Sequence, residues 1–210
     1  MRALIYVPVI HSEVDLGSMA EQVRRPFEEA FGLGEWKRRY ASIEAMWDGL
    51  RHKLLELPLT WQSTRLYQDG LPVCGMEAEI VRDLAAQGSR NYQLLAELVE
   101  LGAHLMGTES PQLLLAEYGR IRQLAQAADR RDTEPAVEEL RRQGEDILRD
   151  RDAFIARRID STLGGEETGI LFIGLLHRVD ELLEGMFEVR HLIHNLPFGA
   201  DPWQRTKERP

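Results

Sequence analysis

The 210-residue sequence contains a single cysteine, Cys74. With one thiol the chain can form neither an internal disulfide nor a metal site built from several thiolates. No stretch approaches the roughly 20 apolar residues that span a bilayer, and the apolar run over 1–10 is not followed by the small-residue cleavage pattern of a signal peptide. These features predict a cytoplasmic protein that does not enter the membrane.

An excess of positive charge is also missing. The formal net charge is -9, although 29% of the residues are charged. Proteins that bind nucleic acid carry a basic surface, whereas the arginine pairs of this chain lie among acidic residues, as on a solvated helix face. We therefore expect no nucleic-acid partner.

Three common site motifs are absent as well. The sequence has no G-x-G-x-x-G after its first apolar run, no G-x-x-x-x-G-K-[ST], and no G-x-S-x-G. Cys74 has no neighbouring histidine that could activate it. The sequence therefore argues against the common nucleotide-binding loops and against a serine or cysteine nucleophile.

The most informative stretch that is present runs from Gly169 to Leu176 and stops at His177. It is short, apolar and without polar alternation, as expected of a strand that is buried on both faces of a parallel sheet. Such a strand would place His177 at its carboxyl end, where open α/β sheets bind their ligands.

Strand-like segments alternate with helical ones along the chain. We expect strands near 3–10, 65–68, 103–106, 169–176 and 187–193. This order predicts an α/β fold with a mainly parallel sheet of about five strands flanked by helices. The segment 111–163 contains no strand signal and predicts a long helical hairpin, hinged around 132–135 and inserted before the fourth strand. A single domain would cover 1–194, followed by an irregular tail at 195–210.

The segment between the first two strands, 18–57, predicts two helices broken near Gly32 to Gly34. Its large apolar residues are expected in the core, among them Phe31, Ile43 and Trp47.

Four of the expected strands are followed by an ionisable residue: His11, Asp69, Glu109 and His177. The carboxyl ends of parallel strands share one edge, so these side chains are expected to meet there. Each also has a simpler explanation when taken alone. Asp69 belongs to a turn with Gly70, and Glu109 precedes a helix whose dipole it would stabilise.

Three further residues are candidates. If the chain stays extended past the first strand, Glu13 and Asp15 lie on the same side as His11, although Asp15 more simply starts the next helix. Arg151 falls on an apolar helical stripe. Either its charge extends to the edge of that stripe, or its guanidinium binds an anionic group in a cleft.

Two segments resemble a known superfamily. The segment 174–177 (Gly-Leu-Leu-His) after an apolar strand, preceded by 151–156 (Arg-Asp-Ala-Phe-Ile-Ala) on a helix, looks like the G-x-x-H and R-D-x-x-x-A elements of the superfamily of erythromycin esterases, ChaN, Tiki and TraB proteins. An earlier G-x-x-H in that group matches 8–11 here, with Pro8 in place of glycine. The resemblance places the acidic position of the family at Glu109, with Asp69 and Glu13 as alternatives.

The resemblance implies a hydrolase of ester or peptide bonds, metal-dependent in some members. His11 and His177 would bind a divalent metal or act as general base, while Glu109 would complete the ligand set or orient water. Arg151 would hold an anionic group or an oxyanion. A metal site could draw on His11, His177, Glu13, Glu109 and Asp69, and would suit manganese, cobalt or zinc.

Other interpretations remain open at this point. A histidine and glutamate pair could activate water without a metal. The fold could also serve a non-catalytic role, binding haem or an anionic small molecule at the same edge, or a protein partner along 111–163. The substrate and the oligomeric state do not follow from the sequence.

Overall fold

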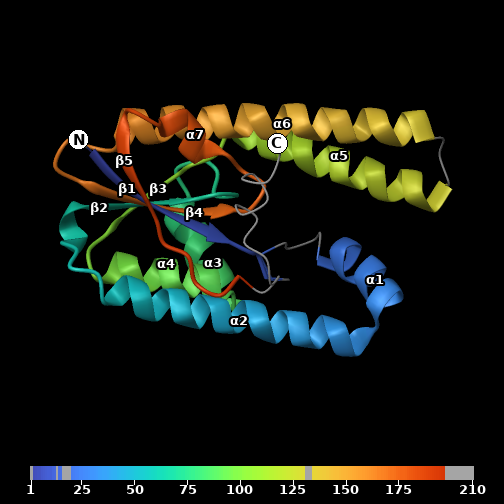
Figure 1. The fold of residues 1–210 in the computed structure, drawn as a ribbon, viewed down its shortest axis with the longest axis horizontal. Coiled ribbons are helices and arrows are strands. Elements are labelled where there is room, and N and C mark those ends of the chain that lie inside the picture. Colours follow the sequence, from blue (N-terminus) through green and yellow to red (C-terminus); the bar gives the residue numbers. More distant parts are fainter. Residues whose placement is uncertain (1, 13, 16–19, 131–133, 197–210) are drawn as a thin grey trace, which may run out of the picture.

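The computed structural model describes residues 2–12, 14–15, 20–130 and 134–196 (Figure 1). The strands in these ranges are β1 (Arg2–Val9), β2 (Thr64–Gln68), β3 (His104–Met106), β4 (Thr168–Gly174) and β5 (Phe187–His191). The α-helices are α1 (Ala20–Phe31), α2 (Leu33–Leu55), α3 (Glu77–Ala86), α4 (Arg90–Glu100), α5 (Pro111–Arg130), α6 (Glu134–Thr162) and α7 (Val179–Leu183). A short 3-10 helix, Trp61–Ser63, precedes β2.

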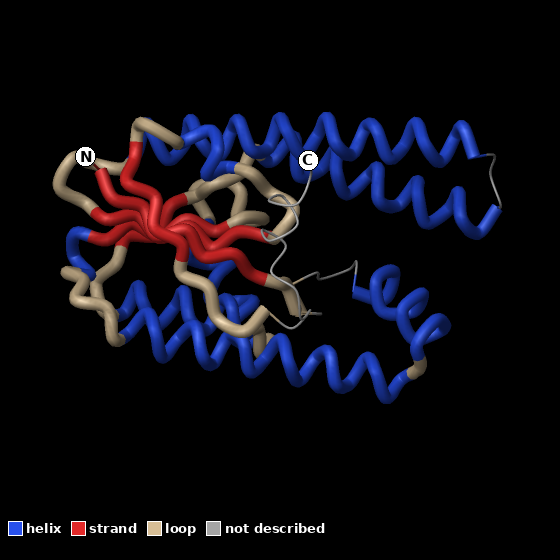
Figure 2. Tube along the Cα trace, in the orientation of Figure 1, coloured by secondary structure: helices blue, strands red, loops and turns tan. Residues whose placement is uncertain are grey.

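The strands form one sheet in the order β3-β2-β4-β1-β5, and every pair is parallel. Helices cover both faces of this sheet (Figure 2). The predicted α/β class with a mainly parallel sheet is therefore confirmed. Pro8 lies past the end of the β1–β5 ladder, whose last pair is Tyr6 with His191, so its missing N–H costs that ladder no hydrogen bond.

The central strand β4 is buried on both sides, as its composition predicts. Ile170 and Phe172 pack into the core formed with α2 and α4, while Leu171 and Ile173 pack into the core formed with α6 and α7. A side chain at Gly169 would not fit, because its Cβ would lie 2.7 Å from Leu4 Cδ1. Successive side chains of β4 therefore point to opposite faces of the sheet, and both faces are packed.

The helices α5 and α6 pack against each other and extend past the carboxyl edge of the sheet (Figure 1). They occupy most of the predicted hairpin segment 111–163, and residues 131–133 of its expected hinge lie outside the described residues. Most of the predicted tail, from residue 197, lies outside them too. In the part of the chain that the structure describes, no helix has both the length and the apolar content needed to cross a membrane.

The helix break predicted near Gly32 is confirmed, since α1 ends at Phe31 and α2 begins at Leu33. Ile43 and Trp47 are buried as expected. The core assignment of Phe31 is wrong, because that side chain is 67% exposed. Figure 1 shows that α1 lies away from the sheet, so Phe31 at its end is remote from the two cores that the sheet forms with its helices.

Replacing Phe172, which is fully buried against Trp47, tests the central position of β4. We expect Phe172→Ala to lower the free energy of unfolding by about 3–5 kcal/mol, because it leaves a cavity between sheet and helix. Urea denaturation followed by circular dichroism measures the change. Leu115→Ala, at a side chain that is 71% exposed, should change stability by less than about 0.5 kcal/mol.

Candidate active site

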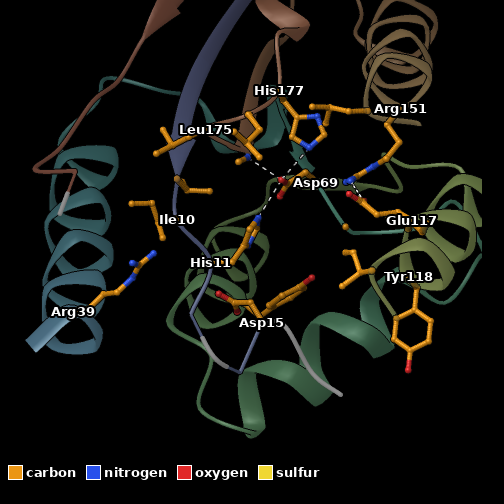
Figure 3. Close-up of a pocket in the computed structure, with 18 residues that line it drawn as sticks. Ile10, His11, Asp15, Arg39, Asp69, Glu117, Tyr118, Arg151, Leu175 and His177 are labelled. Carbon is orange, nitrogen blue, oxygen red and sulfur yellow. Dashed lines mark hydrogen bonds and ion pairs between the residues drawn. The ribbon is translucent and has the colours of Figure 1, made fainter. Parts of the chain in front are cut away.

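The four ionisable residues that follow strands lie together at the carboxyl edge of the sheet. His11 follows β1, Asp69 follows β2, Glu109 follows β3 and His177 follows β4 after a short turn. The turn is closed by a hydrogen bond of 3.1 Å from the backbone N–H of His177 to the carbonyl oxygen of Gly174. Figure 3 shows the side chains of Asp69, His11 and His177 pointing toward one another.

The carboxylate of Asp69 is the centre of this cluster and is only 4% exposed. Its Oδ2 accepts a hydrogen bond of 3.1 Å from Nε2 of His11 and one of 2.8 Å from the backbone N–H of Gly174. Nε2 of His177 lies 3.7 Å from the same oxygen, beyond direct hydrogen-bond range. Oδ1 accepts a 2.9 Å bond from the side-chain amide of Gln68. One oxygen of Asp69 thus faces both histidines.

The pair of Asp69 and His11 is charged. Burial opposes the positive charge of His11, but the adjacent Asp69 carboxylate outweighs it and raises the pKa of the imidazole to about 9. Burial likewise opposes ionisation of Asp69, yet His11 holds the pKa of this carboxyl well below its usual range. At neutral pH His11 is therefore an imidazolium and Asp69 a carboxylate.

Gly174, the first residue of the G-x-x-H segment, makes this arrangement possible. A Cβ at this position would lie 3.1 Å from Oδ2 of Asp69, 3.6 Å from Nε2 of His11 and 3.7 Å from Cδ2 of His177. Any larger side chain would extend into the space between these three groups. The absence of a side chain also leaves its backbone N–H free to approach the carboxylate of Asp69.

The second nitrogen of His177 binds Asp152, a residue of α6 that the sequence analysis did not assign to the site. Nδ1 donates a hydrogen bond to Oδ1 of Asp152, since an ionised carboxylate can only accept. The backbone N–H of Arg178 donates to Oδ2 over 2.9 Å, and both side chains of the pair are buried. Asp152 therefore holds the imidazole of His177 with Nε2 directed at Asp69. The only signal in the sequence is the R-D element that contains it.

Arg151 binds two carboxylates of the chain itself. Its Nε donates to both oxygens of Glu109 over 3.1 and 3.2 Å, and Nη1 donates to Glu117 of α5. Burial opposes its charge, but the hydrogen bonds to Glu109 raise the pKa of the guanidinium. Glu109 is fully buried and also accepts from the backbone N–H of Gly70. Of the two explanations for Arg151, the structure therefore shows the second: the guanidinium binds anionic groups, and these are two carboxylates of the chain itself.

Of the two candidates near His11, Glu13 lies outside the described residues. Asp15 accepts a hydrogen bond of 2.7 Å from the backbone N–H of Ser12 and one from the hydroxyl of Ser89, the N-cap residue of α4. These bonds join the chain after β1 to the start of α4. Asp15 also lines the cavity beside His11.

The described residues do not contain three or more His, Cys, Asp or Glu side chains arranged to hold a metal ion. Two of the predicted ligands bind other residues in this structure. The carboxylate of Glu109 is bound to Arg151, and Nε2 of His11 donates its proton to Asp69. A metal held by both Glu109 and His11 would have to displace these two interactions.

The cluster opens into a cavity of about 650 Å³ between the sheet edge and α5 and α6. His11, Asp69, Arg151 and His177 lie on its wall. None of the described residues that line it is serine, threonine, cysteine or lysine. The described lining thus offers histidines, carboxylates and arginines to a ligand, but none of its members is a serine, threonine or cysteine nucleophile of the kind usual in acyl transfer.

The charged pair predicts a pH dependence of stability. The folded-state pKa of His11, about 9, is above its ordinary value of 6.5, so protonation stabilises the fold fully below pH 6.5 and this contribution is lost as pH rises through 9. We expect the free energy of unfolding to fall by about 1–3 kcal/mol across that window. Urea titrations at each pH should show no such fall in His11→Ala. His52→Ala, at an exposed histidine, should retain it. Equal slopes in wild type and His11→Ala would contradict the charged pair.

The buried triad of Arg151, Glu109 and Glu117 gives a second prediction. Arg151→Met should lower the free energy of unfolding by about 3–5 kcal/mol, because Glu109 is left as a buried charge without a cation. Adding Glu109→Gln should recover part of the loss, and thermal denaturation of the two variants measures this coupling. Arg149→Met, on the exposed side of α6, serves as the control and should cost less than about 1 kcal/mol. Additive effects of the two buried substitutions would argue against the ion pair.

Comparisons with known proteins identify no relative. No protein-family model matches the chain. No curated protein and no solved structure matches it either. The site is therefore interpreted from its own geometry.

Proposed function

We propose that the protein is a hydrolase that cleaves an ester or peptide bond with a water molecule activated by His177. The observation that carries the proposal is the pair of His177 and Asp152. Asp152 accepts a hydrogen bond from Nδ1 of His177, and in this proposal Nε2, on the cavity side, takes the proton from water. A buried carboxylate, an oriented imidazole and an open cavity form the arrangement of a general base.

The position of the attacking water follows from a gap in the cluster. Nε2 of His177 and Oδ2 of Asp69 lie 3.7 Å apart, so one water at the cavity surface can donate a hydrogen bond to each. Because none of the described cavity-lining residues is serine, threonine, cysteine or lysine, water is the nucleophile in this proposal.

The reaction then follows in two steps. The water oxygen attacks the carbonyl carbon while its proton passes to Nε2 of His177, and Asp152 stabilises the resulting imidazolium. When the tetrahedral intermediate collapses, the bond from carbon to the leaving oxygen or nitrogen breaks, and His177 returns the proton to that leaving group. The products are a carboxylic acid and an alcohol or amine, and side chains and water supply every group.

The two histidines have different roles in this proposal. His11, with a pKa of about 9, already carries a proton at neutral pH and cannot act as the base. Its positive charge lies at the cavity wall, where it stabilises the negative charge that develops on the carbonyl oxygen. Arg151 acts on the site through Glu109 and Glu117, by holding α5 and α6 against the sheet edge.

The membership of the erythromycin esterase, ChaN, Tiki and TraB superfamily remains a proposal. It is supported by the way the two sequence elements meet: His177 ends the G-x-x-H segment, Asp152 belongs to the R-D segment, and the two form a hydrogen bond. Gly174 of the same element contacts Asp69. The ester and peptide bonds cleaved by members of that group define the first substrates to test.

Substitution of His177, the proposed general base, and of its partner Asp152 tests the function. With p-nitrophenyl butyrate as substrate, His177→Ala should reduce kcat/KM by about 10²–10⁴-fold, and Asp152→Asn should act in the same direction, since the imidazole loses its orientation. Release of p-nitrophenol measures the rate. Asp150→Asn, two positions away on the exposed side of α6, should leave kcat/KM unchanged.

Two outcomes of this assay would oppose the proposal. Activity that persists in His177→Ala would show that His177 is not the general base. Activity that appears only with added manganese, cobalt or zinc would show that a metal, rather than the imidazole alone, activates the water. Absence of hydrolysis together with a haem absorbance band on titration would instead favour the non-catalytic ligand-binding interpretation.

A further inference from the structure

The cavity has an apolar wall that the proposed chemistry does not use. Leu114, Tyr118 and Ile121 of α5 line it at spacings of four and three residues, which places them on one face of the helix. Leu148 of α6 lines the cavity as well, one turn before Arg151. Figure 3 shows Tyr118, Glu117 and Arg151 on the α5 and α6 side of the cavity. We call Leu114, Tyr118, Ile121 and Leu148 the apolar wall.

The apolar wall is only partly covered by protein. All four side chains are half-buried, although they are large and apolar. Leu176, directly before His177, also borders the cavity and is 78% exposed. Uncovered apolar surface that is gathered around one cavity is the usual mark of a ligand-binding site.

Arg39 of α2 lines the cavity too, but the polar cluster of the proposed chemistry lies at the edge of the sheet. Asp69, His11 and His177 lie there, whereas the part of the wall on α5 runs from Leu114 to Ile121, roughly 10 Å along the helix axis. Glu117 lies on the same stretch, but its carboxylate is bound to Arg151. The cavity is thus polar at the reacting end and apolar along one side.

We infer that the substrate is a carboxylic ester or amide with a medium-length aliphatic acyl chain that lies on the apolar wall. This inference rests on the proposed function. The carbonyl group is placed beside His177, and the chain extends along α5 past Tyr118.

The first arm of the test is hydrolysis of p-nitrophenyl acetate, butyrate and octanoate by the full-length protein. Each methylene that is buried on the wall should raise kcat/KM roughly fourfold until the wall is filled. Leu114→Ser and Leu148→Ser should flatten this dependence of kcat/KM on chain length. Leu115→Ser is the matched control, since Leu115 is adjacent to Leu114 but 71% exposed and outside the cavity lining.

The second arm measures binding without hydrolysis. In His177→Ala, 1-octanol should raise the melting temperature in a saturable manner, whereas ethanol at the same concentration should not. Adding Leu114→Ser should abolish the stabilisation, and adding Leu115→Ser should preserve it. This arm keeps the inference falsifiable if the protein hydrolyses none of the esters.

The outcomes separate the two proposals. Equal kcat/KM for all chain lengths, dependent on His177, would overturn the aliphatic ligand and keep the hydrolase. No hydrolysis, with octanol stabilisation that is lost in Leu114→Ser, would overturn the hydrolase and keep the aliphatic ligand on the wall. Failure of both arms overturns both. If sedimentation shows a dimer that Leu114→Ser dissociates, a second copy of the chain covers the wall and the inference is overturned.

Discussion

The buried negative charge of Asp69 is the constraint on which the rest of the site depends. A carboxylate that is 4% exposed persists only if charge and hydrogen bonds replace its water. Here an imidazolium, a backbone N–H and a side-chain amide do so, from His11, Gly174 and Gln68. Each donor lies at or just after the end of a different strand. The parallel alignment of these strands therefore brings together the groups that replace water around the carboxylate of Asp69. The same alignment brings Nε2 of His177 to 3.7 Å from this carboxylate.

Much of this arrangement could be predicted from the sequence, because the apolar strands and the ionisable residues that follow them are easy to recognise. An apolar run that stops at His177, and ionisable residues after three other strands, were sufficient to place these groups at one edge of a parallel sheet. The register of β4 with β1 and β2 then determined how closely they meet. The strand boundaries were less certain than this edge, since the first strand ends at Val9 and the fourth at Gly174.

The contributions of the helices were harder to predict. Asp152 and Glu117 bind His177 and Arg151, and both lie inside long helices, where no strand end marks them as site residues. Helical spacing shows which residues share a face, but not how far a helix is shifted along the sheet or which carboxylate meets a given cation. The position of Arg151 on an apolar stripe left two explanations open, a charge extended to the edge of the stripe or an anionic partner in a cleft, and identified no partner. Phe31 was misplaced for a related reason, because the pattern of α1 does not show that the helix lies away from the sheet.

The geometry also gives the two histidines at this edge different partners. Asp69 Oδ2 lies 3.1 Å from Nε2 of His11 and 3.7 Å from Nε2 of His177, so only one of the two imidazoles is within hydrogen-bond range of it. His177 binds a carboxylate of its own, Asp152 of α6, through Nδ1. Each imidazole is therefore bound to a different carboxylate through a different nitrogen. The sheet edge brings the two histidines together, and the packing of α6 gives the second one its separate partner.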